Sequence, residues 1–299
     1  MLIVPGSNFT RQSMELAKRL GVEVVEVEKK VFPDGEVYVR LKGLPSDLGS
    51  TCVAVANTMY PSQDTALVET LLLLNAVHKA GGKDVVLVAP YLPYMRQDKV
   101  FLQGEPVSAE VVLEVLTRTI KRGLVVDVHN PGVLESRPWT NILVSDMLVA
   151  QALKYVTDPI VMAPDKGALE RAGFAASKLN LEFDYLIKER DRVTGEVTVK
   201  PKSVSVAGRD VVIVDDIIST GGTLAEAAKF LRSQGARRIV VAATHGLLVG
   251  GAMRKMDEAG FSKIILADTL GVTHISPSIL YVSVVERISG FLREVCLER

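Results

Sequence analysis

The chain has 299 residues, which is long enough for two domains of ordinary size, each with its own hydrophobic core. Its 35 basic and 35 acidic side chains cancel, which argues against a protein that binds nucleic acid or an anionic membrane. This balance favours chemistry on small molecules.

The cysteines and the N-terminus bear on where the protein works. Cys52 and Cys296 are too few for a disulfide framework and show no metal-binding spacing, so a reducing environment fits. The first residues lack the basic and apolar regions of a secretory signal, and no apolar run reaches the roughly 18 residues of a membrane span. We therefore expect a soluble, cytoplasmic protein without a membrane partner.

Short runs of valine, isoleucine and leucine alternate with helical segments along the whole chain. This alternation predicts an α/β fold with mainly parallel strands. The predicted strands cover residues 51–56, 85–89, 124–128, 160–163, 211–214, 239–243 and 264–267.

A faint internal repeat relates the two halves of the chain. A strand, a helix and a second strand at residues 52–89 parallel the same three elements at residues 211–243. The loop of the first copy, residues 57–64, lacks the paired acids and paired glycines of the second. We interpret the first half as a duplicated domain whose own phosphate site is gone, although chance similarity between two βαβ units would also explain the pattern.

The domain boundary is expected near residues 143–146, after an irregular segment and before a predicted helix at 146–155. The predicted domains are residues 1–143 and 144–299. The final predicted helix, at about 285–297, could pack back on the first domain.

The first candidate binding segment in chain order joins two strand-like stretches. Phe32, Asp34, Gly35 and Glu36 place an aromatic ring, two carboxylates and a glycine on an exposed hairpin. An aromatic face beside hydrogen-bond acceptors can hold an adenine by stacking and by contacts to its amino group. A plain hairpin turn is the alternative interpretation.

Two further candidate segments follow predicted strands and so belong to the carboxyl edge of a sheet, where open α/β sheets bind ligands. After strand 85–89, Arg96 could pair with phosphate and Gln97 with a base. After strand 124–128, His129 could bind phosphate or a divalent ion. Taken alone, the first could be an ordinary surface loop and the histidine could be structural.

The second half carries two charged segments of the same kind. Asp165 follows strand 160–163 and so places a carboxylate at a strand end. The alternative interpretation is that this carboxylate caps a helix N-terminus. Lys188 and Arg190 belong to a charged segment that ends in a glycine-containing loop. Near a pyrophosphoryl group, the cations of this segment would bind its negative charge. Taken alone, the segment would be a solvated hairpin.

Residues 211–224 give the strongest signal, because a strand, an acid pair, a glycine loop and a helix follow one another directly. Asp215 and Asp216 are expected at the carboxyl end of the strand, facing a cleft. The helix start favours an anion, and carboxylates accept hydrogen bonds from vicinal hydroxyls. The combination predicts a ribose with its 5-phosphate in the loop, and an acidic turn before a helix is the alternative. The loop residues are Ser219, Thr220, Gly221, Gly222 and Thr223.

This stretch resembles the phosphoribosyl-diphosphate signature that phosphoribosyltransferases share with phosphoribosyl-diphosphate synthases. With the other landmarks, in order, the chain resembles the ribose-phosphate diphosphokinase family over nearly its whole length. The resemblance implies two similar tandem domains of the type I phosphoribosyltransferase-like fold, each a mainly parallel sheet flanked by helices. The further landmarks are Gly6-Ser7-Asn8, residues 32–36, 90–98 and 104–108, Asp127-Val128-His129, Pro164-Asp165-Lys166-Gly167 and Thr244-His245-Gly246.

The resemblance also implies an activity: transfer of the diphosphoryl group of ATP to O1 of ribose 5-phosphate, with Mg²⁺ as cofactor. It assigns Lys188 and Arg190 to catalysis, and His129 and Asp165 to the metal. It implies a homodimer or larger homo-oligomer, because the hairpin would contact ATP bound mainly by a neighbouring subunit. The implied ATP residues are Phe32, Asp34, Gly35, Glu36, Arg96, Gln97 and His129, and the implied ribose 5-phosphate residues are Arg190, Asp215, Asp216, Ser219, Thr220, Gly221, Gly222 and Thr223.

Two rival functions remain for this sequence. A salvage phosphoribosyltransferase needs one domain and no ATP hairpin. A catalytically silent homologue would be expected to lose loop charges or acids, whereas Lys188, Arg190 and the acid pair are present. Walker and dinucleotide-binding glycine motifs are absent from the sequence, which disfavours both of those classes.

Overall fold

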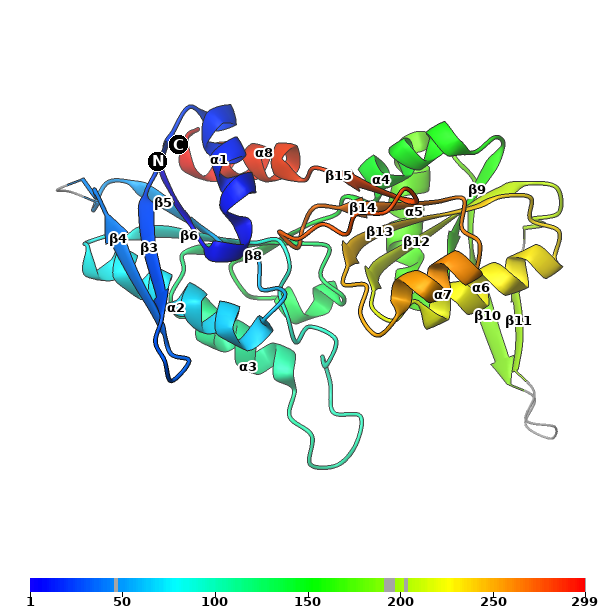
Figure 1. Cartoon of the computed structure of the whole chain (residues 1–299), viewed down its shortest axis with the longest axis horizontal. Coiled ribbons are helices and arrows are strands. Elements are labelled where there is room, and N and C mark those ends of the chain that lie inside the picture. The colour runs from blue at the N-terminus through cyan, green and yellow to red at the C-terminus, as the bar shows by residue number, and fades with distance from the viewer. Residues whose placement is uncertain (46–47, 191–196, 202–203, 299) are drawn as a thin grey trace. The chain divides into compact units, whose positions relative to one another are not determined.

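The computed structural model describes residues 1–45, 48–190, 197–201 and 204–298. The chain divides into two compact units: unit 1 consists of Met1–Ile142, Thr269–Val272 and Ser283–Arg299, and unit 2 of Leu143–Asp268 and Thr273–Val282. Each unit contains a mainly parallel sheet flanked by helices, which confirms the predicted α/β class (Figure 1).

Unit 1 is built on a six-stranded parallel sheet with the strand order β2-β1-β5-β6-β7-β8. Its strands are β1 (Leu2–Pro5), β2 (Glu23–Val24), β5 (Cys52–Ala56), β6 (Asp84–Ala89), β7 (Arg122–Val126) and β8 (Trp139–Ile142). Its helices are α1 (Thr10–Leu20), α2 (Gln63–Lys79), α3 (Ser108–Thr117) and α8 (Val285–Cys296), with short 3-10 turns η1 (Ser7–Phe9) and η2 (Pro131–Leu134).

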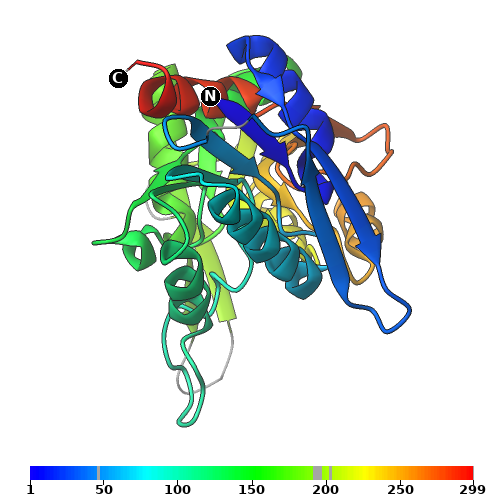
Figure 2. The ribbon, with the colours of Figure 1, turned by 90° about the vertical axis from the view of Figure 1, so that its left-hand side faces the viewer.

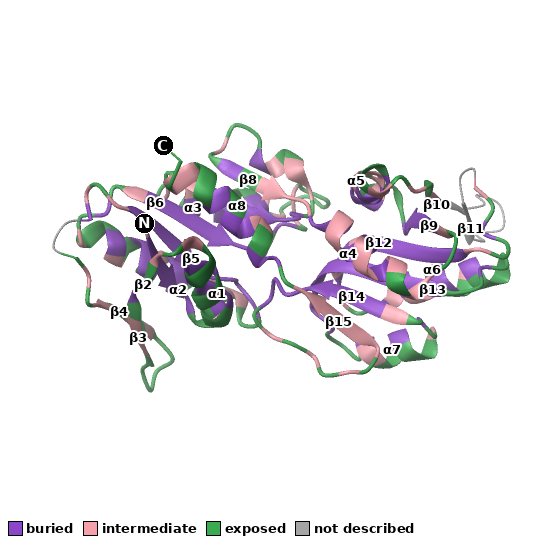
Figure 3. Ribbon diagram, turned by 90° about the horizontal axis from the view of Figure 1, so that it is seen from above, coloured by how far each residue is buried: buried purple, intermediate pink, exposed green. Residues whose placement is uncertain are grey.

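The central strands of this sheet are apolar on both faces. Every residue of β5 is buried, and β6 is buried after its first residue. Such continuous apolar runs are typical of parallel strands covered by helices on both sides. Figure 3 shows the buried residues concentrated on these strands and on the inner faces of the helices.

A separate two-stranded hairpin leaves unit 1, formed by β3 (Glu26–Val31) and antiparallel β4 (Val37–Lys42). Figure 2 shows it in blue, extending beside α2. Its tip closes through hydrogen bonds from the Phe32 N–H to the Glu36 carbonyl and from the Gly35 N–H to the Phe32 carbonyl, both 2.8 Å. Gly35 has a φ of 94°, a conformation that favours glycine.

Unit 2 is built on a seven-stranded sheet with the order β11-β10-β9-β12-β13-β14-β15, parallel except for the pair β10 and β11. Its strands are β9 (Pro159–Ala163), β10 (Phe183–Arg190), β11 (Val197–Pro201), β12 (Asp210–Ile218), β13 (Ile239–Gly246), β14 (Lys263–Ala267) and β15 (Ile279–Val282). Its helices are α4 (Ser145–Ala152), α5 (Leu169–Leu179), α6 (Gly222–Ser233) and α7 (Ala252–Glu258), with 3-10 turns η3 (Leu153–Tyr155) and η4 (Lys166–Ala168).

The predicted end of the strand that carries the acid pair is wrong. The strand expected at 211–214 continues to Ile218, so Asp215 and Asp216 lie within β12 and not beyond its end. The extension has a partner, because β13 runs on to Gly246, and Ile217 pairs with His245. The acid pair is therefore held by strand pairing as well as by its own contacts.

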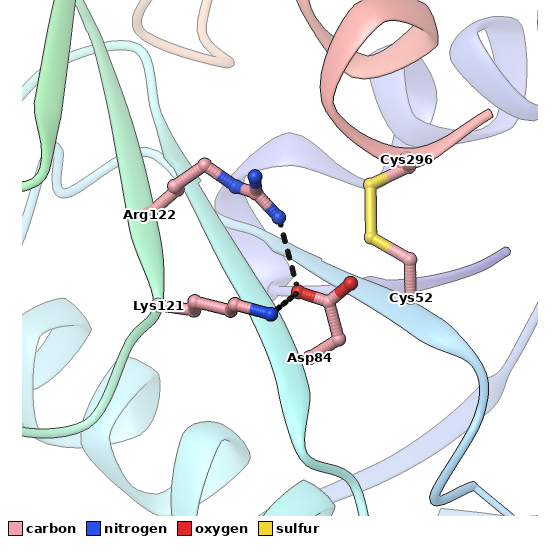
Figure 4. The surroundings of a disulfide bond; sticks show 5 residues. All are labelled: Cys52, Asp84, Lys121, Arg122 and Cys296. Atoms are coloured by element: carbon pink, nitrogen blue, oxygen red, sulfur yellow. Dashed lines mark hydrogen bonds and ion pairs between the residues drawn. A yellow bond between two sulfur atoms is a disulfide. The ribbon is translucent and has the colours of Figure 1, made fainter. Parts of the chain in front are cut away.

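The two cysteines form a disulfide that the sequence analysis did not anticipate. Cys52 begins β5 and Cys296 ends α8, so the bond joins two segments of unit 1 that are 244 residues apart (Figure 4). Cys52 pairs in register with Asp84 of β6, and Asp84 in turn pairs with Arg122 at 3.1 Å. Because the cysteines are oxidised, their number no longer supports a reducing location, and the cytoplasmic location stays a prediction.

Membrane insertion finds no support in the helices. Across the described residues, none of them combines the length and the apolar character that a membrane span requires.

Candidate functional site

The acid pair of unit 2 lies where β12 passes from the core to the carboxyl edge of the sheet. Asp216 is 6 % exposed and Asp215 is partly buried. The Asp216 backbone N–H donates to Asp215 Oδ1 at 2.9 Å. Of the two carboxylates expected to face a cleft, Asp215 is therefore the more accessible, whereas Asp216 is mostly covered.

A buried arginine, to which the sequence analysis gave no role, contacts this pair. Arg171 Nη2 of α5 lies 3.8 Å from Asp216 Oδ2, and both side chains are less than one-tenth exposed. Its Nη1 donates to the Gly167 carbonyl at 3.2 Å, so Arg171 connects the acid pair to the segment after β9. The sequence holds only a weak signal for it: Arg171 stands four residues before Ala175, so the two share one face of α5, which is buried.

The charge state of Asp215 follows from its surroundings. Burial raises the pKa of Asp215 well above its ordinary value, and the negative charges of Asp216 and Asp165 raise it further. The hydrogen bond from the Asp216 N–H acts in the opposite direction. These surroundings therefore favour the neutral form of Asp215 more than water does.

The loop from Ser219 to Thr223 connects β12 to α6. Gly221 is the N-cap of α6 and has a φ of 74°; no side chain caps this end. A Cβ at Gly221 would lie 3.3 Å from Met256 Sδ, so the position favours glycine on two grounds. The N–H groups of a first helical turn lack intrahelical partners and favour an anion.

A second loop holds the backbone of this segment. The Leu248 N–H donates to the Ile218 carbonyl, and the Val249 N–H to the Ser219 carbonyl, both at 3.0 Å. The carbonyl oxygens of Ile218 and Ser219 are thus turned toward residues 248–249. An acid pair and a helix start follow each other within nine residues, which suits a ligand with hydroxyls at one end and a phosphate at the other.

Asp165, predicted as a metal ligand, caps the short turn η4 in this structure. Its Oδ1 accepts hydrogen bonds from the Gly167 N–H at 2.8 Å and the Ala168 N–H at 3.3 Å. Capping is the alternative that the sequence left open. Both capping hydrogen bonds go to Oδ1, and the Asp165 residue is exposed.

In unit 1, the segments that carry Arg96, Gln97 and His129 lie at the carboxyl ends of the adjacent strands β6 and β7. Arg96 and His129 are exposed, and Gln97 is partly buried. The Ser108 hydroxyl donates to the Gln97 amide oxygen at 2.7 Å. Asn130 donates to Asp98 at 2.5 Å and so links the two segments.

The hairpin residues Phe32, Asp34, Gly35 and Glu36 are all exposed at the tip. The Phe32 ring packs edge-on against Tyr38, with centroids 6.1 Å apart, and leaves 46 % of the residue exposed. The ring is therefore held by one neighbour and still available for stacking.

The two predicted catalytic residues lie near the end of one strand. The backbone of Lys188 and Arg190 belongs to β10, but their side chains lie outside the described part of the chain. The predicted metal ligands fall in different units, His129 in unit 1 and Asp165 in unit 2.

Two family profiles match the chain, one to each half. The profile for the N-terminal domain of ribose phosphate pyrophosphokinase matches residues 1–119. The profile for the phosphoribosyl transferase domain matches residues 144–276.

Curated relatives match over nearly the whole chain. A ribose-phosphate pyrophosphokinase of Saccharolobus solfataricus is 38 % identical over 276 residues, covering 91 % of this chain and 94 % of the relative. The enzyme of that name from Pyrococcus furiosus is 38 % identical over 294 residues, covering 97 % of this chain and 100 % of the relative. Among solved structures, the phosphoribosylpyrophosphate synthetase of Mycobacterium smegmatis has a TM-score of 0.88 and 27 % identity, covering 98 % of each chain.

Proposed function

This chain belongs to the ribose-phosphate pyrophosphokinase family, and we propose from that membership that it transfers the diphosphoryl group of ATP to O1 of ribose 5-phosphate. The products are 5-phospho-α-D-ribose 1-diphosphate and AMP. The observation that best supports this proposal is that sequence similarity to these enzymes extends over both halves of the chain. The match to the Pyrococcus furiosus enzyme covers 97 % of the chain. A salvage phosphoribosyltransferase would have no need of the N-terminal domain matched at residues 1–119.

Ribose 5-phosphate is proposed to bind in unit 2. Its phosphate accepts hydrogen bonds from the N–H groups and hydroxyls of residues 219–223, which no side chain caps. Its vicinal hydroxyls donate to Asp215 and Asp216, whose negative charge would repel a phosphate at the same position. This division of charge fixes which end of the sugar phosphate enters the loop, so that O1 points away from it.

ATP is proposed to bind to residues of unit 1. Arg96 pairs with phosphate, Gln97 and His129 contact the nucleotide, and exposed Phe32 stacks on the adenine of ATP held mainly by a neighbouring subunit. Asp34, Gly35 and Glu36 complete the tip. Two observations support this assignment: the proximity of the Arg96 and His129 segments, and the exposure of the Phe32 ring.

Mg²⁺ is the proposed cofactor. Within the described residues, no three His, Cys, Asp or Glu side chains cluster to form a complete site, but Mg²⁺ usually takes one or two carboxylates together with substrate phosphates and waters. Asp165 fits that pattern, because capping occupies one of its oxygens. His129 fits less well, since Mg²⁺ prefers oxygen. When bound, the ion offsets phosphate charge.

In the proposed reaction, the O1 hydroxyl of the sugar attacks the β-phosphorus and the bond to the α-phosphate oxygen breaks. AMP leaves with that oxygen, so positioning and charge stabilisation are the main tasks of the protein. Lys188 and Arg190 are proposed to stabilise the charge on the transferred group and the leaving oxygen.

The test follows AMP by chromatography after mixing the pure protein with MgATP, ribose 5-phosphate and inorganic phosphate. AMP that forms only with ribose 5-phosphate supports the proposal.

Lys188→Ala should lower kcat by about 10²–10³ if Lys188 stabilises charge, and unchanged turnover would remove Lys188 from the mechanism. Absence of AMP would favour the silent homologue, or the transferase if added 5-phospho-α-D-ribose 1-diphosphate and a base gave pyrophosphate.

A further inference from the structure

A buried glutamate in unit 1 joins three elements. Glu69 lies on α2 and is 1 % exposed. Its Oε1 accepts hydrogen bonds from the Ser7 N–H at 2.8 Å and the Ser7 hydroxyl at 2.7 Å. Its Oε2 accepts from Lys29 Nζ at 2.7 Å. Ser7 follows β1 at the carboxyl edge of the sheet, and Lys29 is in the middle of β3.

Stability alone does not account for this arrangement. A carboxylate is costly to bury, and a buried ion pair often contributes no more stability than apolar side chains of similar volume. The pair does fix geometry, because Glu69 can satisfy its oxygens only when Ser7 and Lys29 both occupy their places. The contact therefore sets the position of the hairpin relative to α2 and to the end of β1.

The position of Lys29 along β3 shows which part of the hairpin this contact holds. Side chains alternate along a strand, so Val27, Lys29 and Val31 share one face of the hairpin. Val27 packs against the core of unit 1, Lys29 reaches Glu69, and Val31 is 62 % exposed. On this face of β3, Lys29 marks the point where the hairpin leaves the domain.

We propose that Lys29 and Glu69 are positioning residues for nucleotide binding: their ion pair sets the direction in which the hairpin presents Phe32. The inference rests on the proposed role of the hairpin in holding adenine. Phe32 lies three positions after Lys29, roughly 10 Å along an extended strand, so a small rotation at Lys29 displaces the ring. Ribose 5-phosphate is proposed to bind in unit 2 and does not depend on this ion pair.

The test compares steady-state kinetics of wild type with the double variant Lys29→Met/Glu69→Gln. This variant breaks the link to the hairpin, leaves no uncompensated charge, and keeps an acceptor for Ser7. We expect the KM for ATP to rise about tenfold while the KM for ribose 5-phosphate stays within about twofold. The single variant Lys29→Arg keeps the ion pair, so its KM for ATP should stay close to that of wild type.

Lys42→Met is the matched control. Lys42 is on the same hairpin and pairs at 3.2 Å with Glu26, but Glu26 is on the other hairpin strand, so this pair does not anchor the hairpin to α2. Its KM for ATP should stay within about twofold of wild type. An equal rise for Lys42→Met, or parallel rises in both KM values for the double variant, would overturn the positioning role.

Phe32→Ala separates the two levels of the proposal. If Phe32→Ala raises the KM for ATP and the double variant does not, the positioning inference fails and the role of the hairpin stands. If Phe32→Ala leaves the KM for ATP unchanged, the role of the hairpin fails and the positioning inference falls with it. A rise in both, with a KM for ATP close to that of wild type for Lys29→Arg, is the expected result.

Discussion

Asp215 makes the stability of the substrate-free protein depend on pH. Burial and the neighbouring carboxylates raise its pKa above the ordinary value of 3.8, so the folded state binds this proton more tightly than the unfolded state. The free energy of unfolding therefore falls as the pH rises from 3.8 through the raised pKa. Asp215→Asn removes this penalty, and its melting temperature should exceed that of wild type at pH 8 but not at pH 3.5.

Asp257→Asn provides the control for this measurement, because Asp257 is an exposed acid on α7. Its melting temperature should follow wild type at both pH values. A melting temperature for Asp215→Asn equal to or below that of wild type at pH 8 would contradict the raised pKa.

Arg171 gives a second prediction, on substrate affinity. Arg171→Met removes the cation beside Asp216 and the link to Gly167, so the acid proposed to bind ribose loses its orientation. We expect the KM for ribose 5-phosphate to rise about tenfold or more, with a smaller change in the KM for ATP. Arg254→Met is the control, since Arg254 is 78 % exposed on α7. Equal KM values for Arg171→Met and wild type would remove Arg171 from the site.

Single charged residues on buried helix faces mark the limit of sequence analysis at this scale. The acid pair and the glycine loop form a continuous pattern, which predicts their order along the strand and helix but not the extension of β12 to Ile218. Arg171 and Glu69 belong to no pattern, because their partners Asp216, Ser7 and Lys29 come from distant segments. Burial reveals their roles, and burial is known only once the fold is known.

Among the elements, α8 carries the clearest prediction. The Cys52–Cys296 disulfide ties it to β5 and closes a separation of 244 residues in the sequence. Cys296→Ser should lower the free energy of unfolding by about 2–4 kcal/mol, in the range usual for native disulfides. Thermal melts with and without a reductant follow the effect. The reductant should lower the melting temperature of wild type and leave that of the variant unchanged.

Arg19→Met is the comparison for the disulfide, because Arg19 of α1 also holds α8 through an ion pair with Glu286 at 3.4 Å. Both side chains are well exposed, so its loss should change the melting temperature little. Equal melting temperatures for wild type with and without reductant would show that the disulfide does not stabilise the fold.

Periodicity predicts most strands of this chain well and helix ends less well. The strand expected at 85–89 is Asp84–Ala89, and the one at 264–267 is Lys263–Ala267. The helix expected at 146–155 ends at Ala152 and continues as the 3-10 turn η3. Local composition identifies a buried strand, whereas the end of β12 depends on how far its neighbour β13 extends.

For the whole molecule, the proposed sharing of the ATP site between subunits gives a mixing prediction. Phe32→Ala damages the hairpin, and Asp216→Asn damages the proposed ribose site. After dissociation and random reassociation of the two variants as dimers, about a quarter of the wild-type activity should return, because each mixed dimer holds one intact site. Recovery no greater than the sum of the separate variants would indicate that each hairpin serves its own subunit.

The two-unit organisation could be predicted only in part from the sequence. Alternating strands and helices indicate two α/β halves, and each half has a parallel sheet. The assignment of Thr269–Val272 and α8 to unit 1 depends on contacts between distant residues. One such contact is the 2.6 Å hydrogen bond from the Thr58 hydroxyl to the Thr269 carbonyl.

The disulfide also has a topological consequence. The chain begins in unit 1, builds unit 2 and returns to unit 1, where Cys296 bonds to Cys52 near the start. The backbone between these cysteines is therefore part of a covalent ring that contains all of unit 2. A protease that cuts this ring once leaves both fragments on one molecule, and they would separate on a denaturing gel only after reduction. During synthesis, unit 1 cannot be completed until the last helix has left the ribosome.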